Sequence, residues 1–345
     1  MLRNSQTQYE RKGSGDIARR GGSVVRRSDR KAGFAMTKPL TAPTRVVRDY
    51  LHNSLVWNDF LAQGGGLVEG DVVIVTPVKA GTTWTQRIIQ QILHNGAEND
   101  GSLSDTSPWL DSSWADHATM FDVLKQQLES GNRRVIKSHL PADALPIAQE
   151  ARYVFVGRNG KDAAISFHNM IYNYSESTMS TINAIHAQWS GSSAPLVIPA
   201  DMRAFFDLWL DTDGYGCSDL FDIVQSWWKL RGEPNVLVLH YRELKDDIRG
   251  QIARVAEFLG IDPATLRMDV IAEHCSFDYM SGRAEKMAPF NGEHMSSAKA
   301  FFHKGPKRDF RAELTAAQVA RFDQVALRRL GAQCASWLET GQLSG

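Results

Sequence analysis

The segment DVVIVTPVKAGTTWTQRIIQQILH, residues 71–94, contains an apolar run, a short polar loop and an amphipathic stretch in succession. The apolar run 71–76 is rich in valine and too short for a helix, which is typical of a buried parallel strand. Residues 82–94 repeat apolar side chains at helical spacing, from Trp84 through the isoleucines that follow. The segment therefore predicts a strand–loop–helix unit of an α/β fold.

The same alternation continues on both sides of this unit, from about residue 43 onward. Further short apolar runs predict strands at Arg134–Lys137, Tyr153–Gly157 and Val236–His240. Amphipathic stretches predict helices at Lys161–Tyr172, Phe221–Leu230, Arg249–Leu259 and Ala316–Leu330. Residues Tyr174–Asp219 have weak periodicity and predict loops and short helices. The whole pattern predicts one α/β domain over residues 39–345, with a central parallel sheet flanked by helices.

The charge of the chain is balanced overall but unevenly distributed. Its 345 residues include 39 Lys/Arg and 39 Asp/Glu, and 43% are hydrophobic, which allows a substantial core. Residues 1–38 hold ten basic and three acidic residues, which leaves 29 basic and 36 acidic residues in the remainder. A mildly acidic folded part argues against a nucleic-acid partner.

The N-terminal 38 residues are predicted to be a disordered basic tail. The pairs at Arg19-Arg20 and Arg26-Arg27 do not form a twin-arginine export signal, because no apolar stretch follows them. A second interpretation is that Met36 is the native start and that the residues before it are a non-native extension. Both interpretations leave the domain from residue 39 unchanged.

The cysteines and the hydropathy pattern bear on the compartment. Cys217, Cys275 and Cys334 are far apart and odd in number, so we expect neither a zinc site nor a disulfide framework. No stretch approaches eighteen consecutive apolar residues, so no membrane span is expected. These features predict a protein of the reducing cytoplasm.

The loop between the first strand and helix has the composition of an anion site. Backbone N–H groups and the positive end of a helix dipole meet there, and Gly81 permits close approach of the backbone. Lys79 adds a charge, and Thr82 and Thr83 add hydroxyl donors. The order of lysine and glycine is not that of a Walker A motif. The alternative is a helix capped by threonine beside a solvated lysine.

Three further segments carry polar residues at strand or loop ends. Arg158 follows the strand 153–157, and Ser166 lies two turns into the next helix, so the two could form a second anion site. Alternatively, Arg158 pairs with Asp162, which could also cap the helix or tether a loop. His139 follows the strand 134–137, at the sheet edge where α/β folds bind ligands. A histidine there suits a general base, although a lone histidine is often structural.

The last such segment is FHKGPKRDF, residues 302–310, which has four potential cations and predicts either a phosphate clamp or a solvated basic loop. Along the chain, between about residues 50 and 325, the four segments occur in the same order as the motifs of cytosolic sulfotransferases, which they resemble. The resemblance implies a P-loop-like nucleotide-binding core of the sulfotransferase type. It also implies 3′-phosphoadenosine 5′-phosphosulfate (PAPS) as cosubstrate, 3′,5′-adenosine bisphosphate (PAP) as product, and no metal.

The resemblance also implies which residues bind the nucleotide. The loop 77–84 is similar to the family's Pro-x-Lys-x-Gly-Thr-Thr-Trp motif, which holds the 5′-phosphosulfate, although Ala80 lacks the hydroxyl often found there. Arg158 and Ser166 would bind the 3′-phosphate. His303 stands where the family has an arginine, so Lys307 or Arg308 is a candidate replacement. The full set implied is Lys79, Ala80, Gly81, Thr82, Thr83, Trp84, Arg158, Ser166, Tyr241, Cys275, Phe277, His303, Lys304 and Gly305.

The same resemblance assigns catalytic roles. His139 would deprotonate the acceptor, and Lys79 and Lys137 would neutralise charge on the transferred group. The expected acceptor is a hydroxyl, or an amine, of a small lipophilic or phenolic molecule. Alternatives are an ATP-dependent small-molecule kinase and an inactive nucleotide-binding scaffold. The family's dimerisation segment is matched only loosely at Arg311–Phe322, so a homodimer stays open.

Several aromatic residues could line the acceptor pocket or fill the core. They are Trp109, Trp114, Phe121, Phe167, Tyr172, Phe205 and Trp209.

Overall fold

The computed structural model describes residues 41–63, 66–98, 101–217, 219–289, 294–302 and 309–342. Within these ranges, a sheet of four parallel strands has the order β2–β1–β3–β4. The strands are β1 (Val72–Val75), β2 (Val135–Ser138), β3 (Arg152–Gly157) and β4 (Val236–His240). The predicted central parallel sheet is confirmed, and each predicted strand is present with its ends within one residue of the prediction.

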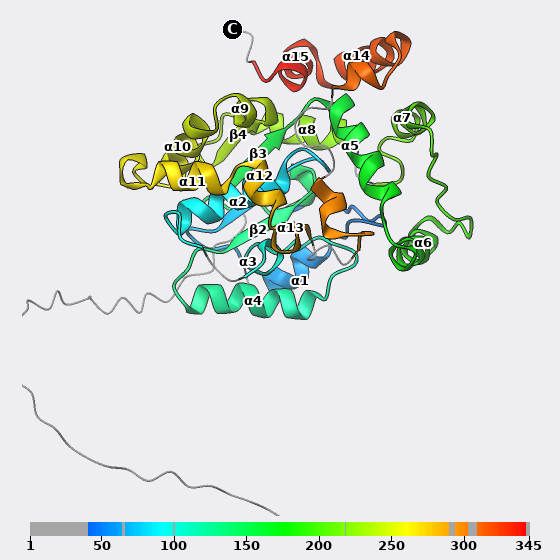
Figure 1. The fold of residues 1–345 in the computed structure, drawn as a ribbon. Helices are drawn as coiled ribbons and strands as arrows, with labels where there is room; N and C mark the ends of the chain where they lie inside the picture. Colours follow the sequence, from blue (N-terminus) through cyan, green and yellow to red (C-terminus); the bar gives the residue numbers. More distant parts are fainter. Residues whose placement is uncertain are drawn as a thin grey trace, which may run out of the picture. The chain divides into compact units, whose positions relative to one another are not determined.

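The strands are apolar on both faces because both faces of the sheet are covered (Figure 1). In β1, Val73 and Val75 belong to one buried cluster, whereas Val72 and Ile74 belong to another. This alternation follows from the two-residue repeat of a strand. Burial on both faces explains why these strands read as continuous apolar runs.

One face of the sheet is covered by α2 (Thr82–Leu93), α10 (Ile248–Phe258) and α11 (Met268–His274). In α2 the isoleucines pack against the strands, as the spacing after Trp84 predicts. α2 begins directly after the loop 76–81, so the packing of its apolar stripe also fixes the position of that loop.

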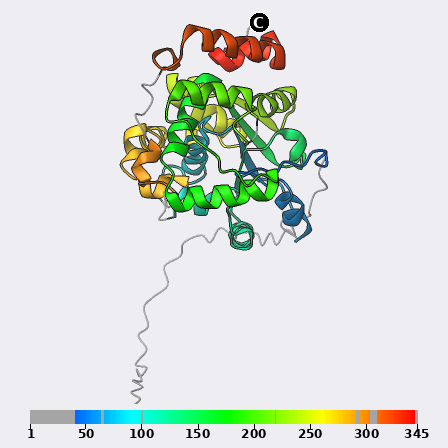
Figure 2. The ribbon, with the colours of Figure 1, turned by 90° about the vertical axis from the view of Figure 1, so that its right-hand side faces the viewer.

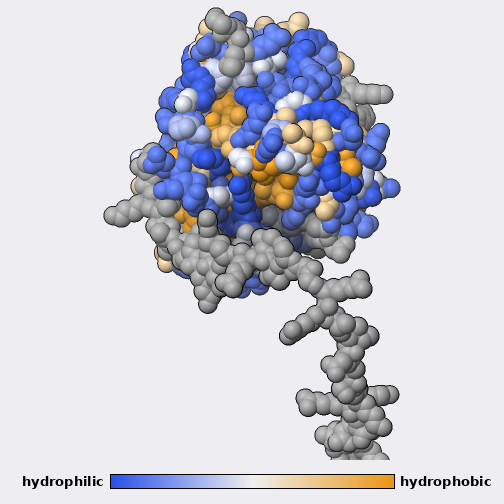
Figure 3. Space-filling view, turned by 90° about the vertical axis from the view of Figure 1, so that its left-hand side faces the viewer, coloured by the Kyte–Doolittle hydropathy of each residue, from blue (hydrophilic) through white to orange (hydrophobic). Residues whose placement is uncertain are grey.

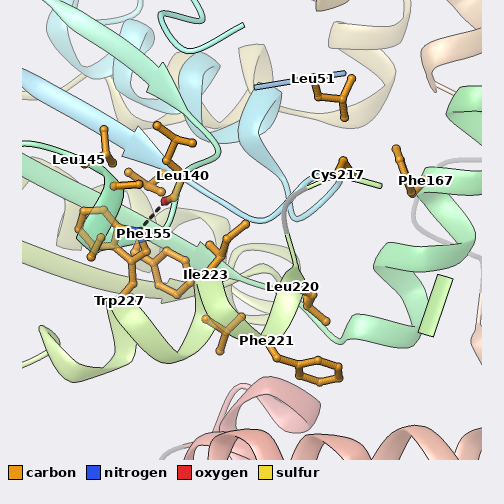
Figure 4. Close-up of a cluster of buried hydrophobic side chains, with 14 of the residues drawn as sticks. Leu51, Leu140, Leu145, Phe155, Phe167, Cys217, Leu220, Phe221, Ile223 and Trp227 are labelled. Atoms are coloured by element: carbon orange, nitrogen blue, oxygen red, sulfur yellow. Dashed lines mark hydrogen bonds between the residues drawn. The ribbon is translucent and has the colours of Figure 1, made fainter. Parts of the chain in front are cut away.

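The other face is covered by α1 (Val56–Ala62), α5 (Gly160–Tyr172) and α8 (Leu220–Lys229). Figure 4 shows this cluster around Trp227, whose ring stacks on Phe155 at 6.1 Å and whose Nε1 donates to the Leu140 carbonyl at 3.0 Å. The helices α14 (Ala316–Leu330) and α15 (Ala332–Thr340) follow, and α14 packs on α8 (Figure 2).

The region predicted as loops and short helices contains two full helices, α6 (Glu176–Ser190) and α7 (Met202–Asp211). Their N-caps are Ser175 and Asp201, whose side chains accept hydrogen bonds from backbone N–H groups of the first turn. The prediction of short elements was wrong for α6. Only two of its fifteen residues are buried, so its sequence lacks the apolar stripe by which a helix is recognised.

The remaining helices are short apart from α4, which has thirteen residues. They are α3 (Leu103–Thr106), α4 (His117–Glu129), α9 (Tyr241–Asp246), α12 (Phe277–Ser281) and α13 (Ala284–Met287). Across the described ranges, none of the helices is both long and apolar enough to cross a bilayer. On the face drawn in Figure 3, apolar residues gather in a central area that hydrophilic residues surround.

Candidate active site

A cavity of about 380 Å³ lies at the carboxyl ends of the strands. His139 follows β2, Arg158 follows β3 and Tyr241 follows β4, and all three line this cavity with Lys79 from the loop after β1. Parallel strands end at one edge of a sheet, so residues from four separate segments meet there. The three predicted catalytic residues, Lys79, Lys137 and His139, all line the cavity.

The loop after β1 has a strained backbone. Lys79 has a φ of 67°, unusual for a residue with a side chain, and Gly81 has a φ of 108°. A Cβ at Gly81 would lie 2.9 Å from Cδ2 of Tyr241, so glycine is required there by both conformation and space. Thr82 then begins α2, and its hydroxyl lies 2.6 Å from that of Thr76.

Two lysines line the cavity, Lys79 partly buried and Lys137 buried, and both have a lowered pKa. Burial, and then the positive charges of Arg158 and Lys137, lower the pKa of Lys79 to about 7. Burial also lowers the pKa of Lys137 to about 7, although the carboxylate of Asp111 opposes this shift. Each ammonium lies over an aromatic ring, that of Lys79 at 4.0 Å from the Phe301 centroid.

His139 is buried and held in one orientation. Its Nδ1 lies 2.7 Å from the carbonyl oxygen of Thr76, which can only accept, so Nδ1 carries the proton and Nε2 a lone pair. Its backbone N–H donates to Asp111 Oδ2 at 3.2 Å. Burial, together with the charges of Lys137 and His52, holds the pKa of His139 well below its usual value. The imidazole is therefore neutral at neutral pH and can accept a proton at Nε2.

Arg158 and Ser166 line the same cavity. Nη1 of Arg158 donates to the Lys79 carbonyl at 2.8 Å, and its guanidinium lies 4.4 Å from the Tyr241 ring centroid. Its Nε is buried and has no hydrogen-bond partner among the described residues. A buried donor without a partner at a cavity wall is suited to an anion.

The alternative role of Arg158, an ion pair with Asp162, is not seen among the ion pairs of the described residues. Asp162 accepts from the backbone N–H of Phe310 at 3.1 Å, so it tethers the chain that follows the predicted clamp. The N-cap of α5 is Asn159, whose side chain accepts from Lys161 N at 3.0 Å. Of the two roles predicted for Asp162, the tether is observed and the cap is not.

Most of the remaining predicted nucleotide residues also line the cavity. Nε1 of Trp84 donates to the Cys275 carbonyl at 2.8 Å, and its ring meets that of Tyr241 edge to face at 5.4 Å. Thr83, Cys275 and Phe277 complete this end. Ala80 is fully buried and does not line the cavity. His303, Lys304, Gly305, Lys307 and Arg308 lie outside the described residues.

Residues 69–333 match the model of a protein family that is described as the sulfotransferase domain. The chain belongs to the sulfotransferase family. Membership confirms the predicted family and enzyme class, a PAPS-dependent sulfotransferase. A glycolipid sulfotransferase of Mycobacterium tuberculosis is 29% identical over 296 residues, covering 80% of this chain and 88% of the relative. Sulfotransferase 1E1 of Bos taurus is 28% identical, covering 73% and 81%.

Two solved structures resemble this sulfotransferase. Mouse sulfotransferase SULT7A1 complexed with PAP has a TM-score of 0.55 at 24% identity, covering 78% of this chain and 87% of that one. Retinol dehydratase in complex with androsterone and inactive cofactor PAP has a TM-score of 0.56 at 18% identity, covering 81% and 86%. These likenesses confirm the predicted fold.

The aromatic residues proposed for an acceptor pocket of the sulfotransferase divide into two groups. Trp109 and Trp114 line the cavity. Phe167, Phe205 and Trp209 are core residues, Phe121 packs on Phe60, and Tyr172 is 58% exposed. The sequence prediction also missed several lining residues, which belong to no motif and reach the cavity only through the fold: Leu51, Met170, Tyr174, Lys245, Met280, His294, Met295 and Phe301.

Proposed function

We propose that this sulfotransferase transfers the sulfuryl group of PAPS to a hydroxyl of a small, partly apolar acceptor, with His139 as general base. The observation that carries the proposal is the state of His139. A neutral imidazole, with Nδ1 held by the Thr76 carbonyl, lines one cavity together with Lys79, Lys137 and Arg158.

The proposed position of the donor rests on the distribution of positive groups. The 5′-phosphosulfate would lie on the loop 77–84, against Lys79 and the N-terminus of α2. The 3′-phosphate would lie on Arg158, whose Nε is free to donate, and on Ser166. The PAP held by the two similar structures supports a nucleotide of this kind. The adenine would meet Trp84, Tyr241 and Phe277.

In the proposed reaction the acceptor oxygen attacks sulfur as its proton passes to Nε2 of His139. The bond between sulfur and the bridging oxygen of the 5′-phosphate breaks in line, and PAP leaves with the electron pair. Lys79 and Lys137 would stabilise the charge that develops on the bridging and peripheral oxygens. Preorganised cations in a buried site are an effective source of catalysis.

The apolar part of the acceptor would contact the apolar wall of the cavity, whose lining includes Leu51, Trp109, Trp114, Met170 and Tyr174. Such a wall favours a lipophilic or phenolic molecule over a free sugar or a small polar amine. A hydroxyl suits a neutral imidazole base, since an ammonium acceptor would meet the cations of Lys79 and Lys137.

Replacement of His139 tests the proposal directly. His139→Ala should lower kcat by about a thousandfold, because general-base assistance contributes about this much. PAP binding, measured by thermal shift, should change less than about threefold, since the phosphate contacts remain. His94→Ala, at an exposed histidine after α2, is the matched control and should keep full turnover. Turnover within tenfold of wild type in His139→Ala would refute the role of base.

A further inference from the structure

Two buried threonine hydroxyls link His139 to the start of α2. Thr76 is fully buried, and its Oγ1 lies 2.6 Å from Oγ1 of Thr82 and 3.3 Å from Nδ1 of His139. Thr82 begins α2 and lines the cavity, as His139 does. We propose that Thr76 is a positioning residue that couples binding of the sulfuryl donor at Thr82 to the strength of His139 as a base. This inference rests on the proposed function and extends it to a residue outside the cavity lining.

The register of the sheet brings Thr76 and His139 together. Val75, at the end of β1, lies opposite Ser138, at the end of β2, and the next residues along the two strands are Thr76 and His139. The Thr76 N–H donates to the Ser138 carbonyl at 3.4 Å, which continues the ladder by one step. The carbonyl and the hydroxyl of Thr76 therefore both reach the imidazole, at 2.7 Å and 3.3 Å from Nδ1.

The positions of the hydrogens follow from the carbonyl of Thr76. Because that oxygen can only accept, Nδ1 of His139 carries a proton and cannot accept one. The Thr76 hydroxyl therefore accepts from Nδ1, and its own hydrogen is left for Oγ1 of Thr82. In the part of the chain that the structure describes, these two hydroxyls make no other hydrogen bond. The hydrogen of the Thr82 hydroxyl is thus left for an acceptor in the cavity.

The hydrogen bonds of this chain run in one direction, from His139 through Thr76 to Thr82. An anionic oxygen that accepts from Thr82 makes Oγ1 of Thr82 a stronger acceptor, because hydrogen bonds in series polarise one another. The same change passes to Oγ1 of Thr76, which then stabilises the Nδ1–H of an imidazolium more strongly. His139 therefore becomes a better base when a sulfuryl or phosphoryl oxygen is bound at Thr82. All three side chains are buried, so little water competes for these groups.

A spectroscopic test of this coupling needs no acceptor. In protein labelled with ¹⁵N at histidine, the Nδ1–H signal of His139 is identified by its loss in His139→Ala. Saturating PAP should move this signal downfield, because the hydrogen bonds of Nδ1 strengthen. Thr76→Val keeps the carbonyl but breaks the chain, so the movement should be largely lost, and Thr76→Ser should restore it. Thr106→Val, whose hydroxyl donates to the Ser102 carbonyl at 3.0 Å outside the cavity, is the matched control.

Turnover of 4-nitrophenol with PAPS gives an independent measure. Thr76→Val should lower kcat about tenfold at saturating substrates, because a hydrogen bond to the developing imidazolium is lost. Its PAP affinity should change less than about threefold, since the proposed phosphate contacts remain. Adding Thr76→Val to Thr82→Val should lower kcat by less than about threefold further, because the chain is already broken. Thr106→Val should keep full kcat.

The outcomes separate this inference from the proposed function. A His139 signal that stays in place when PAP binds, or that moves equally in Thr76→Val, would overturn the inference. Full additivity of Thr76→Val and Thr82→Val in kcat would do the same. If Thr76→Val fails to fold, Thr82→Val breaks the chain at its other end and should also remove the movement. Failure to bind PAP, or turnover that survives His139→Ala, would reject the proposed function instead.

Discussion

Lys79 and Lys137 show how burial prepares single residues for an anion. Each has a pKa of about 7 because the cavity removes water from its ammonium. Each lysine is therefore expected to titrate near neutral pH and not in the high range of an exposed lysine. An anionic donor would restore the full charge, since a phosphosulfate beside an ammonium favours the protonated form.

The two lysines predict a pH dependence of PAP affinity. Above pH 7 the free enzyme must take up protons to bind PAP, so affinity should fall at least tenfold between pH 7 and pH 9. Below pH 7 no further gain is expected, because the lysines are already protonated. Calorimetric titrations in two buffers would measure affinity and proton uptake. Lys79→Arg keeps its charge at high pH and should flatten the profile; an unchanged profile would contradict this explanation.

Arg158 predicts discrimination between nucleotides. Arg158→Ala should weaken PAP binding by about tenfold to a hundredfold, because a charge-assisted contact to the 3′-phosphate is lost. Binding of adenosine 5′-monophosphate, which lacks that phosphate, should change less than threefold. Equal weakening of both nucleotides would instead indicate that Arg158 acts by holding the Lys79 carbonyl. Arg254→Ala, at an arginine bonded to Val238 O, is the control.

At the scale of elements, the strand–loop–helix unit around β1 and α2 combines regular packing with local strain. The sheet and the apolar stripe of α2 fix both ends of the loop. Between them, Lys79 and Gly81 adopt positive φ angles, and Tyr241 from α9 closes over Gly81. The strain is maintained because its anchors are buried.

Gly81 predicts a stability effect that its conformation alone does not explain. Gly81→Ala should lower the free energy of unfolding by about 2–3 kcal/mol, because a positive φ and a contact of 2.9 Å with Tyr241 both oppose a Cβ. Gly131→Ala is the matched control, since Gly131 has a φ of 72° but no atom within 4 Å of an added Cβ. Its cost should be near 1 kcal/mol. Equal costs in urea unfolding would contradict the steric explanation.

In the molecule as a whole, the candidate site and a buried ion pair of the core lie at opposite ends of the strands. The carboxyl edge of the sheet carries the cavity, whereas the ion pair joins the other ends of β1 and β2. Nε of Arg134 donates to Asp71 Oδ1 at 2.8 Å, and both side chains are almost fully buried. Neither Asp71 nor Arg134 lines the cavity, so the pair contributes to the fold and is not part of the site.

This pair predicts loss of stability without loss of binding. Asp71→Asn should cost about 3–5 kcal/mol in urea unfolding, because it leaves a buried guanidinium uncompensated. Adding Arg134→Met should recover much of that loss by removing the isolated charge. The folded fraction of each variant should bind PAP with wild-type affinity. A double variant no more stable than Asp71→Asn would show that desolvation of Arg134 is not the cause.

The local sequence pattern was enough to predict the strands, most of the flanking helices and the positions of the motif residues. These features depend on periodicity and on the order of residues along the chain. Lys79, Arg158 and His139 could be predicted from loops at strand ends, since parallel strands bring those ends to one edge. The length of α6 could not be predicted, because that helix buries too few residues to show an apolar stripe in its sequence. Roles of the motif residues stay predictions until the variants are measured.

The meeting of Trp109, Lys137 and His139 depended on tertiary structure. Trp109 reaches β2 by an isolated bridge to Lys137, and no periodicity in the sequence indicates that contact. The lowered lysine pKa values arise in the same way, because burial depends on segments distant in sequence. Sequence therefore determined the donor chemistry through contiguous motifs, whereas the shape offered to the acceptor was decided by packing.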